Sequence, residues 1–508
     1  MTTGVTMDVL GLVDVPTWLQ WVLLLVGMIV AYVVFMSWDH NTFKKMGIDG
    51  PKPNPVFGNF RTLFKEGVVQ ADMTFYKKYG RIFGTFESRH PILYIAEPKL
   101  LKEIMVKQFN SFVNRRGSFA DVVDVELSQM LTLLKDDHWR NVRNIMTPTF
   151  SAKKLRQMTP LINSAGDRMM ENIESKIATD EDIDIHKLLS AFTMDVIAST
   201  GFGLKVDAQK NPDDPFMKNA FLFRDSKWFA TIGILSMFLP VLARIPRLLG
   251  ISFVKKASTF FVKATKNALK ERRANPGVYT DFMSIMADAE DTEEQDKTSG
   301  KTVLTESEIA SQAVLFFLAG YDTTASTLTF VTYHFCIYPD ICDKVIQEID
   351  EKLGKATPNY DNVHELTYLE MCIHETMRLF PLASRIDRVA SRDVTIGNIE
   401  IPKGMIVNIP VGAIQRDPEF WPEPEKFIPE RFSAEAKAKM DPFVFLPFGA
   451  GPRNCIGLRL ALLEMKMAIA RILQNYRPIK SPNTKVPIEI MKLGNRPKGF
   501  VMKFERRK

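Results

Sequence analysis

The sequence predicts a mainly α-helical fold with small β-sheets, preceded by one N-terminal transmembrane helix. A charge-free apolar run near the N-terminus and a long apolar helical segment at residues 305–338 predict the helical part. Residues 91–96 and 394–412 are rich in Ile and Val and punctuated by Gly and Pro, which predicts a few short strands. With 46% hydrophobic and 25% charged residues, the composition is that of a globular protein and argues against wholesale disorder.

The run from Trp21 to Trp38 contains no charge and has aromatic residues at both ends, as membrane-spanning helices do at the interfaces. A cleaved signal peptide is the alternative. The run is long for the apolar region of a signal peptide, no basic segment precedes it and no small-residue cleavage site follows it. These features favour a transmembrane anchor.

The charges around the run predict how the anchor is oriented. Asp8 and Asp14 precede it, whereas Lys44, Lys45 and Lys52 follow it, so the positive-inside rule places the body on the cytoplasmic side. Alternating prolines after the run predict a stiff connector. We therefore expect a lumenal N-terminus (1–20), a transmembrane anchor (21–38), a Pro-rich linker (39–60) and a single domain (61–508).

Composition restricts the compartment and the partners. The four cysteines form no C-x-x-C pair and the chain has no N-x-S/T triplet, which suits a reducing cytosol. The formal net charge of +7 suits anionic lipid headgroups or an acidic protein partner. The sequence disfavours nucleic acid as a partner, and we expect none, because no dense basic stripe interleaved with aromatic residues is present.

Two further segments stand out. Residues 228–243 carry no charge and are followed by basic residues, but Pro240 interrupts the run and it is shorter than a typical span. It is either a surface that dips into the membrane or a buried helix pair. The acidic, polar segment 288–300 is predicted to be an exposed loop.

The long central helix has a clear start and end. Thr305 and Glu308 form a capping-box pattern, and the apolar run continues to Tyr338, where Pro339 follows. A helix of roughly 33 residues would be about 50 Å long, enough to cross the whole body.

The centre of this helix, residues 319–324, reads A-G-Y-D-T-T, which costs helix stability. Threonine hydroxyls can bond the carbonyl one turn back and open a groove beside the small Ala-Gly pair, wide enough for dioxygen and a water. A core helix with satisfied threonines is the alternative that this segment alone leaves open.

A cysteine lies at the start of a second helix. Residues 448–457 read F-G-A-G-P-R-N-C-I-G, and a strongly helical, amphipathic stretch follows from Leu458 to Leu473. A helix N-terminus is expected to lower the pKa of a thiol there and to favour the thiolate that a metal ligand requires. Glycines let the backbone approach a flat cofactor, and Arg453 could neutralise a carboxylate on it.

A buried structural cysteine is the usual alternative for a lone thiol. The pattern F-x-x-G-x-R-x-C-x-G fixes five residues, so chance occurrence is very rare and the alternative is disfavoured. Zinc is disfavoured because no second Cys or His lies at ligand spacing.

These segments resemble the cytochrome P-450 superfamily. The cysteine decapeptide and the A-G-x-D-T-T helix centre carry the resemblance, which extends over nearly the whole chain. F-V-N-R-R at residues 112–116 and P-E-R-F at 429–432 look closest to the microsomal drug and steroid oxidases of vertebrate liver, a clan that includes thromboxane synthase. The resemblance implies the cytochrome P-450 fold, a helix-rich triangular body around haem, with 61–508 as one haem-thiolate catalytic domain.

The resemblance implies the cofactor site. Cys455 would be the metal ligand, donating its thiolate to the iron of haem b. Trp139 and Arg143 lie four residues apart, on one helix face, and could together hold a propionate. The full set of implied cofactor-binding residues is Cys455, Arg453, Trp139, Arg143, Arg115, Arg388 and Phe448.

A further pattern, E-x-x-R, occurs at Glu375 and Arg378, which share a helix face. Alone it indicates only a surface ion pair. The resemblance implies a structural lock in which Arg431 of the P-E-R-F segment joins the pair.

The resemblance also implies the reaction. One oxygen atom of O2 would be inserted into lipophilic small molecules such as steroids, fatty acids or xenobiotics, with NADPH electrons delivered by NADPH-cytochrome P-450 reductase; cytochrome b5 is a further candidate donor. Thr323, with Asp322 beside it, would position water and deliver protons. The protein would be a single-pass endoplasmic reticulum protein with its catalytic domain in the cytosol.

Two surfaces follow from the same resemblance. The residues that match substrate-recognition segments are Thr132, Leu133, Leu318, Ala319, Leu382 and Ala383, each of which could equally be plain core. Basic residues around the cysteine loop, including Arg459 and Lys466, look like a docking face for the acidic reductase.

Two other functions compete with oxygenation. A haem-thiolate isomerase of peroxide substrates, as thromboxane synthase is, often lacks the helix alcohol that Thr323 supplies here. A non-enzymatic haem carrier or sensor needs no acid-alcohol pair. The chain departs from the liver-type pattern in a longer segment between Arg116 and Trp139, which affects substrate inference, and in Asp322, where a glutamate is common.

Overall fold

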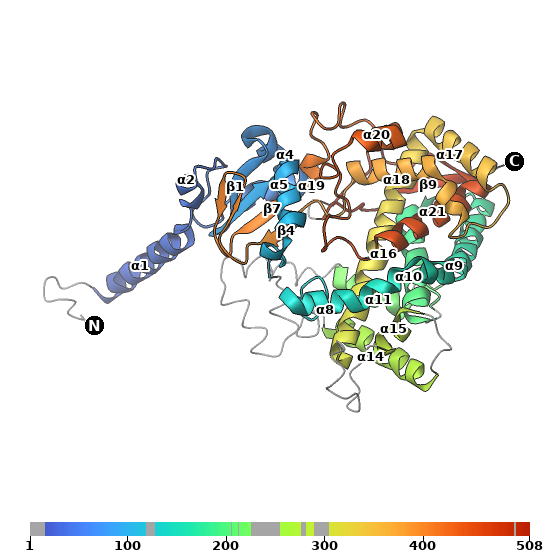
Figure 1. Ribbon diagram of the computed structural model, residues 1–508, viewed down its shortest axis with the longest axis horizontal. Coiled ribbons are helices and arrows are strands. Elements are labelled where there is room, and N and C mark those ends of the chain that lie inside the picture. The colour runs from blue at the N-terminus through green and yellow to red at the C-terminus, as the bar shows by residue number, and fades with distance from the viewer. Residues whose placement is uncertain are drawn as a thin grey trace, which may run out of the picture.

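The computed structural model describes residues 16–117, 128–204, 206–211, 213–224, 255–275, 281–288, 304–491 and 494–507. Residues 228–243, for which the sequence left a membrane-dipping surface or a buried helix pair open, lie outside these residues. Nearly all of the predicted acidic loop at 288–300 also lies outside them. Helices dominate the described part (Figure 1). The longest are α1 (Thr17–Ser37), α9 (Ala152–Ala178), α10 (Ile185–Phe202), α14 (Lys255–Ala274), α16 (Glu306–Ile337) and α21 (Leu458–Asn475).

Shorter elements fill the space between these helices. The α-helices are α2 (Thr42–Lys45), α3 (Phe60–Glu66), α4 (Val68–Tyr79), α5 (Pro98–Lys102), α8 (Asp136–Met146), α11 (Pro215–Arg224), α15 (Phe282–Asp288), α17 (Pro339–Lys352), α18 (Thr367–Leu379), α19 (Val411–Ile414) and α20 (Ala434–Lys439). Single turns of other helix types are η1 (Glu103–Lys107), η2 (Phe109–Ser111), η3 (Thr147–Phe150), η4 (Asn362–Glu365) and η5 (Pro429–Phe432).

The strands within the described residues form three sheets, which confirms the prediction of small β-sheets. The four-stranded sheet has the order β1 (Ile82–Glu87), β2 (His90–Ile95), β7 (Ile406–Ile409) and β4 (Ile386–Val389), with β2 and β7 parallel. The second joins β3 (Ile183–Asp184), β9 (Val501–Arg506) and β8 (Tyr476–Ile479), and the third is the hairpin of β5 (Val394–Ile396) and β6 (Ile399–Ile401). The strands predicted at 91–96 and within 394–412 are therefore confirmed.

Helix α1 projects away from the body on the side of the four-stranded sheet (Figure 1). It has 21 residues, and only 6% of its most apolar window is buried. At 1.5 Å per residue it matches the ~30 Å hydrocarbon core of a bilayer. It begins four residues before Trp21, directly after Pro16, which is the N-cap residue and has extended backbone (φ −54°, ψ 139°). It is a candidate membrane span.

Helix α16 runs through the body beside α10, α14, α18 and α21 (Figure 1). Its capping box is present as predicted: the Thr305 hydroxyl accepts from the Glu308 N–H, and the Glu308 carboxylate accepts from the Thr305 N–H. The helix ends at Ile337, and Pro339 begins α17. This helix also has the length and apolarity of a span, but 72% of that window is buried inside the protein. It is a core helix.

Distant parts of the chain share one core around the four-stranded sheet. This cluster joins residues from Phe43 to Phe112 with residues from Ile386 to Leu446. A second cluster joins α9, α10, α16, α18 and α21. Neither cluster is built from one continuous stretch of sequence. The segments that form them therefore belong to one folded unit and not to a series of separate domains along the chain.

Candidate active site

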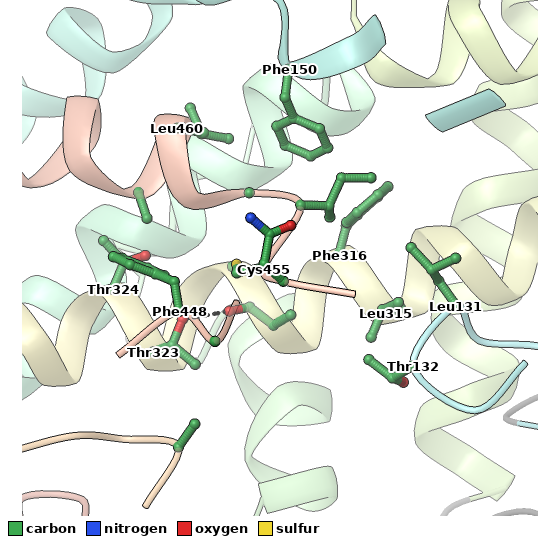
Figure 2. Close-up of a pocket in the computed structure, with 18 of the residues that line it drawn as sticks. Leu131, Thr132, Phe150, Leu315, Phe316, Thr323, Thr324, Phe448, Cys455 and Leu460 are labelled. Atoms are coloured by element: carbon green, nitrogen blue, oxygen red, sulfur yellow. Dashed lines mark hydrogen bonds between the residues drawn. The ribbon is translucent and has the colours of Figure 1, made fainter. Parts of the chain in front are cut away.

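A cavity of ≈ 350 Å³ lies between α16 and the loop that precedes α21. Its wall is largely apolar, with Phe316 and Leu315 from α16, Leu131 from the segment before α8, and Phe150 from η3 (Figure 2). A volume of this size and an apolar wall with a few polar groups are typical of small-molecule and cofactor sites.

The loop before α21 presents the thiol of Cys455 to this cavity (Figure 2). Gly449 and Gly451 have φ angles of +72° and +71°, which favour glycine. A Cβ on Gly451 would lie 1.9 Å from the carbonyl oxygen of Met105, so the two backbones pack too closely for any side chain. The loop closes with a hydrogen bond from the Cys455 N–H to the Phe448 carbonyl at 2.9 Å.

The surroundings of the thiol act in opposite directions on its charge. Burial raises the pKa of Cys455 above its ordinary value, whereas the N–H groups of Gly457 and Leu458 and the charge of Arg143 oppose that rise. These N–H groups belong to the first turn of α21, where a helix stabilises negative charge. The thiol is therefore positioned to bind as a thiolate once a cation lies beside it.

Four arginines, here called the cradle arginines (Arg115, Arg143, Arg388 and Arg453), line the same cavity. They come from the segment after η2, from α8, from β4 and from the cysteine loop. Among the described residues, none of the four forms an ion pair with a carboxylate. Burial lowers the pKa of Arg453 to about 9 and that of Arg388 to about 10, and repulsion from Arg115 adds to both shifts.

The polar contacts of the cradle arginines are with backbone and amide oxygens instead. Arg453 donates to the carbonyl of Leu134 at 2.7 Å and stacks over the ring of Trp139, 4.8 Å from its centroid. Arg143 donates to the carbonyl and side-chain oxygens of Asn454 at 2.9 and 3.0 Å. The buried Nε atoms of Arg115, Arg388 and Arg453 have no hydrogen-bond partner within the described residues.

Such a set fits a ligand that carries two carboxylates. Several buried guanidinium groups without carboxylate partners are costly in the protein alone and are stabilised by an anionic ligand. Haem b has two propionates, a flat apolar ring and an iron that accepts one thiolate, and the cavity offers arginines, apolar walls and Cys455 for these. The residues present therefore fit haem.

The wall opposite the loop is the centre of α16. The Thr323 hydroxyl donates to the Ala319 carbonyl at 2.6 Å, the bond one turn back that the sequence predicts. A Cβ on Gly320 would lie 2.9 Å from the Ile197 side chain, so glycine here lets α10 approach closely. Ala319, Gly320 and Thr323 all line the cavity.

Asp322 lies elsewhere. Its side chain is 4% exposed, pairs with Nε of Arg496 at 2.9 Å and is not part of the cavity wall. Arg496 comes from the segment before β9, so the partner of this predicted catalytic acid is far away in the sequence. The pair ties α16 to the C-terminal part of the chain.

The residues predicted to contact substrate divide into two groups. Thr132, Ala319, Leu382 and Ala383 line the cavity. Leu133 and Leu318 do not; they pack against a neighbouring hydrophobic cluster.

Many other wall residues were not predicted from the sequence, among them Leu131, Phe150, Ile197, Leu315, Phe316, Thr324 and Thr327. Phe316 and Thr327 could have been found, because with Gly320 and Thr323 they repeat every three or four residues along one face of α16. Phe150 and Ile197 carry no such local signal.

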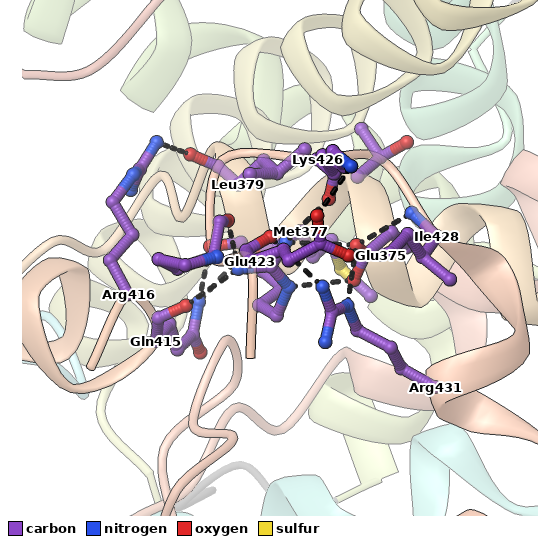
Figure 3. Close-up of polar contacts among 12 residues, drawn as sticks. Glu375, Met377, Leu379, Gln415, Arg416, Glu423, Lys426, Ile428 and Arg431 are labelled. Carbon is purple, nitrogen blue, oxygen red and sulfur yellow. Dashed lines mark hydrogen bonds and ion pairs between the residues drawn. The ribbon is translucent and has the colours of Figure 1, made fainter. Parts of the chain in front are cut away.

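Away from the cavity, Glu375, Arg378 and Arg431 form a second charged group, here called the lock cluster (Figure 3). Arg378 donates through Nε and one terminal nitrogen to both oxygens of Glu375, at 2.7 and 2.8 Å, and both side chains are fully buried. Nε of Arg431 lies 3.4 Å from Glu375.

Backbone groups complete the lock cluster. Arg378 donates to the carbonyls of Gln415, Pro424 and Lys426, and Glu375 accepts from the N–H of Ile428 at 2.9 Å. The cluster thus holds the loop of residues 415–428 against α18.

One residue of the predicted docking face was placed wrongly. Lys466 is only 3% exposed, and its ammonium group lies 2.7 Å from Glu370 and donates to the Val363 carbonyl. Lys466 lies on the same face of α21 as the exposed Arg459, two turns earlier. The two differ in exposure because η4 and Glu370 of α18 cover that face at Lys466. Lys466 therefore cannot contribute to a docking surface.

The fold and the site define a haem-thiolate protein of the kind that the cysteine loop predicts. The sequence model of the family Cytochrome P450 matches residues 48–504. Cytochrome P450 3A11 of Mus musculus is 38% identical over 492 residues, covering 96% of each chain. Lithocholate 6-beta-hydroxylase of Mesocricetus auratus is 39% identical over 460 residues, covering 90% of each chain, and cytochrome P450 3A7 of Homo sapiens is 37% identical over 488 residues, covering 95% of each.

The chain belongs to the cytochrome P450 family. It is an oxidoreductase of the monooxygenase type, which acts through haem. The alternatives of a peroxide isomerase and of a haem carrier or sensor are not favoured.

Proposed function

We propose that this chain oxidises large lipophilic molecules, steroids among them, with NADPH electrons supplied by NADPH-cytochrome P-450 reductase. The observation that carries the proposal is the apolar cavity of ≈ 350 Å³ shared by Cys455 and the threonine face of α16. The similarity of the chain to a hydroxylase named for the steroid acid lithocholate supports a polycyclic substrate. The apolar helix α1 supports a location on the endoplasmic reticulum membrane with the body in the cytosol.

Haem b, when bound, supplies oxygen activation, and electron donation from a thiolate ligand favours cleavage of the O–O bond. Cys455 is the proposed ligand to its iron. The cradle arginines and Trp139 hold the propionates, and Phe448 contributes to the apolar surface beside the ring. The cradle arginines remain charged at neutral pH, because burial lowers the pKa of Arg453 only to about 9.

Thr323 has a defined proton geometry. Because its hydroxyl proton is donated to the Ala319 carbonyl, its oxygen presents acceptor lone pairs toward the cavity. A water held there would donate to Oγ1 of Thr323 and keep its other proton for the reacting oxygen. Asp322 would supply protons to this water only after its carboxylate turns away from Arg496.

Substrate would lie against the wall formed by Thr132, Ala319, Leu382 and Ala383. Thr132 is the polar member of this group and can accept from or donate to a substrate hydroxyl. Arg459 is exposed, close in sequence to Cys455, and is available to contact an acidic reductase. Cytochrome b5 is a further candidate electron donor.

The test is turnover of lithocholic acid by the full chain in lipid vesicles with the reductase and NADPH. Thr323→Ala should lower product per NADPH consumed by about tenfold and raise peroxide release, since proton delivery contributes ~10²–10⁴-fold to such steps. Thr332→Val is the matched control: Thr332 makes the same kind of bond on α16, to the Leu328 carbonyl at 2.8 Å, but is away from the cavity. Rearrangement of a peroxide without NADPH, and no hydroxylated product with it, would contradict the proposal.

A further inference from the structure

One part of the cavity wall is a short irregular segment between residues 128 and 134. It places Leu131 and Thr132 beside the Leu315–Phe316 turn of α16 (Figure 2). Two turn bonds hold its centre, from the N–H groups of Leu133 and Leu134 to the Met130 carbonyl at 2.7 and 3.0 Å. The position of the segment against α16 depends in addition on the side chains that bond its other N–H and C=O groups.

Gln312 of α16 makes two such bonds. Its side-chain nitrogen donates to the Gln129 carbonyl at 2.6 Å, and its side-chain oxygen accepts from the Leu131 N–H at 2.7 Å. The side chain is 0% exposed, and both ends of the amide are occupied by the backbone of the wall segment. The amide therefore holds the segment at two backbone groups, which belong to residues 129 and 131.

The helix itself does not need this amide. Gln312 lies in a turn whose neighbours Ile309, Ala313 and Phe316 are buried and apolar, and its own backbone is bonded within α16. Burying an amide in such a place costs free energy unless its hydrogen bonds are made. The two bonds to the wall segment are what offset this cost.

The other end of the segment is held from the cofactor side. Arg453 donates to the carbonyls of Thr132 and Leu134, at 3.3 and 2.7 Å. The wall segment is therefore fixed between the distal helix and the cysteine loop. Leu131 is bonded directly to Gln312 and Thr132 directly to Arg453, so loss of either bond releases one of the two wall residues.

We propose that Gln312 is a positioning residue for substrate specificity: it fixes the backbone of residues 129–131 so that Leu131 and Thr132 limit which carbon of a bound substrate reaches the reactive centre. The inference rests on the proposed function and adds a determinant that never touches the substrate. Without the amide the Leu131 N–H loses its partner, the wall segment moves, and other orientations of the substrate become accessible.

The test uses holoenzyme, reductase, NADPH and testosterone, a rigid steroid with many distinguishable C–H positions. Gln312→Met keeps the length of the side chain and removes both bonds. It should change the ratio of hydroxylated isomers at least about fivefold and raise KM severalfold, while the total rate stays within about threefold, because wall contacts of this size change discrimination by ~10-fold or more. Thr332→Val should leave the ratio unchanged.

An unchanged isomer ratio in haem-loaded Gln312→Met would overturn the inference, since a merely structural role predicts lower stability with the same products. If Gln312→Met does not retain haem, Gln312→Leu decides, because it also removes both bonds, to the Leu131 N–H and to the Gln129 carbonyl, with a shorter apolar side chain. A changed ratio then supports the inference and an unchanged ratio overturns it. Absence of any hydroxylated steroid from the wild type would instead contradict the proposed function.

Discussion

Two arginine-rich groups in this protein differ in what balances their charge. In the lock cluster, a fully buried carboxylate receives two arginines, and backbone carbonyls take the remaining donors. The cradle arginines bring four positive charges to one cavity, with carbonyls as partners and, among the described residues, no ion pair to a carboxylate. The lock cluster is complete within the chain, and the cradle is completed by a ligand.

The difference separates a structural role from a binding role without reference to any other protein. A buried ion pair that satisfies all its donors ties loops together and is costly to break. Buried arginines that repel one another and whose pKa values fall through burial destabilise the chain unless an anion is present. Substitutions in the two groups should therefore have opposite effects on the protein without its cofactor.

The largest effect is expected in the lock cluster. Glu375→Gln leaves Arg378 buried without its carboxylate, which should cost about 3–5 kcal/mol of stability. Thermal unfolding of the purified protein, with and without haem, measures this. Glu430→Gln on η5 is the control, because the Glu430 pair with Lys344 at 3.2 Å is exposed and should contribute less than about 1 kcal/mol. Equal effects of both substitutions would contradict the structural role.

A smaller effect of a different kind is expected in the cradle. Arg388→Leu removes one of the proposed propionate donors, so haem affinity should fall about 10- to 100-fold, as loss of one charged hydrogen bond predicts. The cofactor-free protein should be as stable as the wild type or more stable, because a buried unpaired charge is gone. Haem transfer to apomyoglobin and unfolding of the apoprotein measure the two effects. Reduced stability of the apoprotein with unchanged haem affinity would reverse the assignment.

His334 tests how strongly the lock cluster acts on its surroundings. Burial, followed by the charge of Arg378, lowers the pKa of His334 to about 3. The unfolded chain then binds more protons than the folded chain below about pH 6.5, so stability is complete above that pH and is lost as pH falls toward 3. At pH 5 the contribution of His334 to the loss should be about 2 kcal/mol.

His334→Gln should remove this part of the acid sensitivity. Its Nδ1 lies 3.0 Å from the Thr376 hydroxyl and its ring stacks on Phe427, so the substitution will also lower stability at neutral pH. The informative quantity is the difference in unfolding free energy between pH 7.5 and pH 5. The same difference in wild type and His334→Gln would show that other groups cause the acid sensitivity.

Arg496 gives the smallest expected effect. Arg496→Met frees Asp322 from its ion pair without touching the cavity wall. If the pair restrains proton supply, product per NADPH should change about two- to threefold, and Arg496→Lys should restore most of the wild-type value. Unchanged coupling in Arg496→Met would indicate that Asp322 acts only as a structural partner of the C-terminal segment.

Local patterns predicted the parts of the fold that depend on nearby residues. The capping box at Thr305 and the stop at Pro339 predicted the ends of α16, and the Ile/Val segments predicted strands, because caps, prolines and short strands are decided within a few residues. E-x-x-R likewise predicted that Glu375 and Arg378 share a helix face. The family resemblance supplied the cradle arginines, which no local pattern brings together.

The remaining features depend on contacts between distant segments. Lys466 was predicted on a docking surface from the family resemblance, yet it pairs with Glu370 from another helix. Arg496 reaches Asp322 from near the C-terminus, and nothing in either segment predicts this. Gln312 does carry a signal, a lone amide within an apolar helical run, but its partners lie more than 180 residues away.

The central claim is that the Cys455 thiolate is the ligand of a haem held by the cradle arginines. The most direct test is the reduced, carbon monoxide difference spectrum of the detergent-solubilised full chain, wild type beside Cys455→Ala. The account predicts a Soret band near ~450 nm in the wild type that is lost in the variant. A band near ~420 nm in well-folded, haem-loaded wild type, or the same spectrum in both proteins, would contradict it.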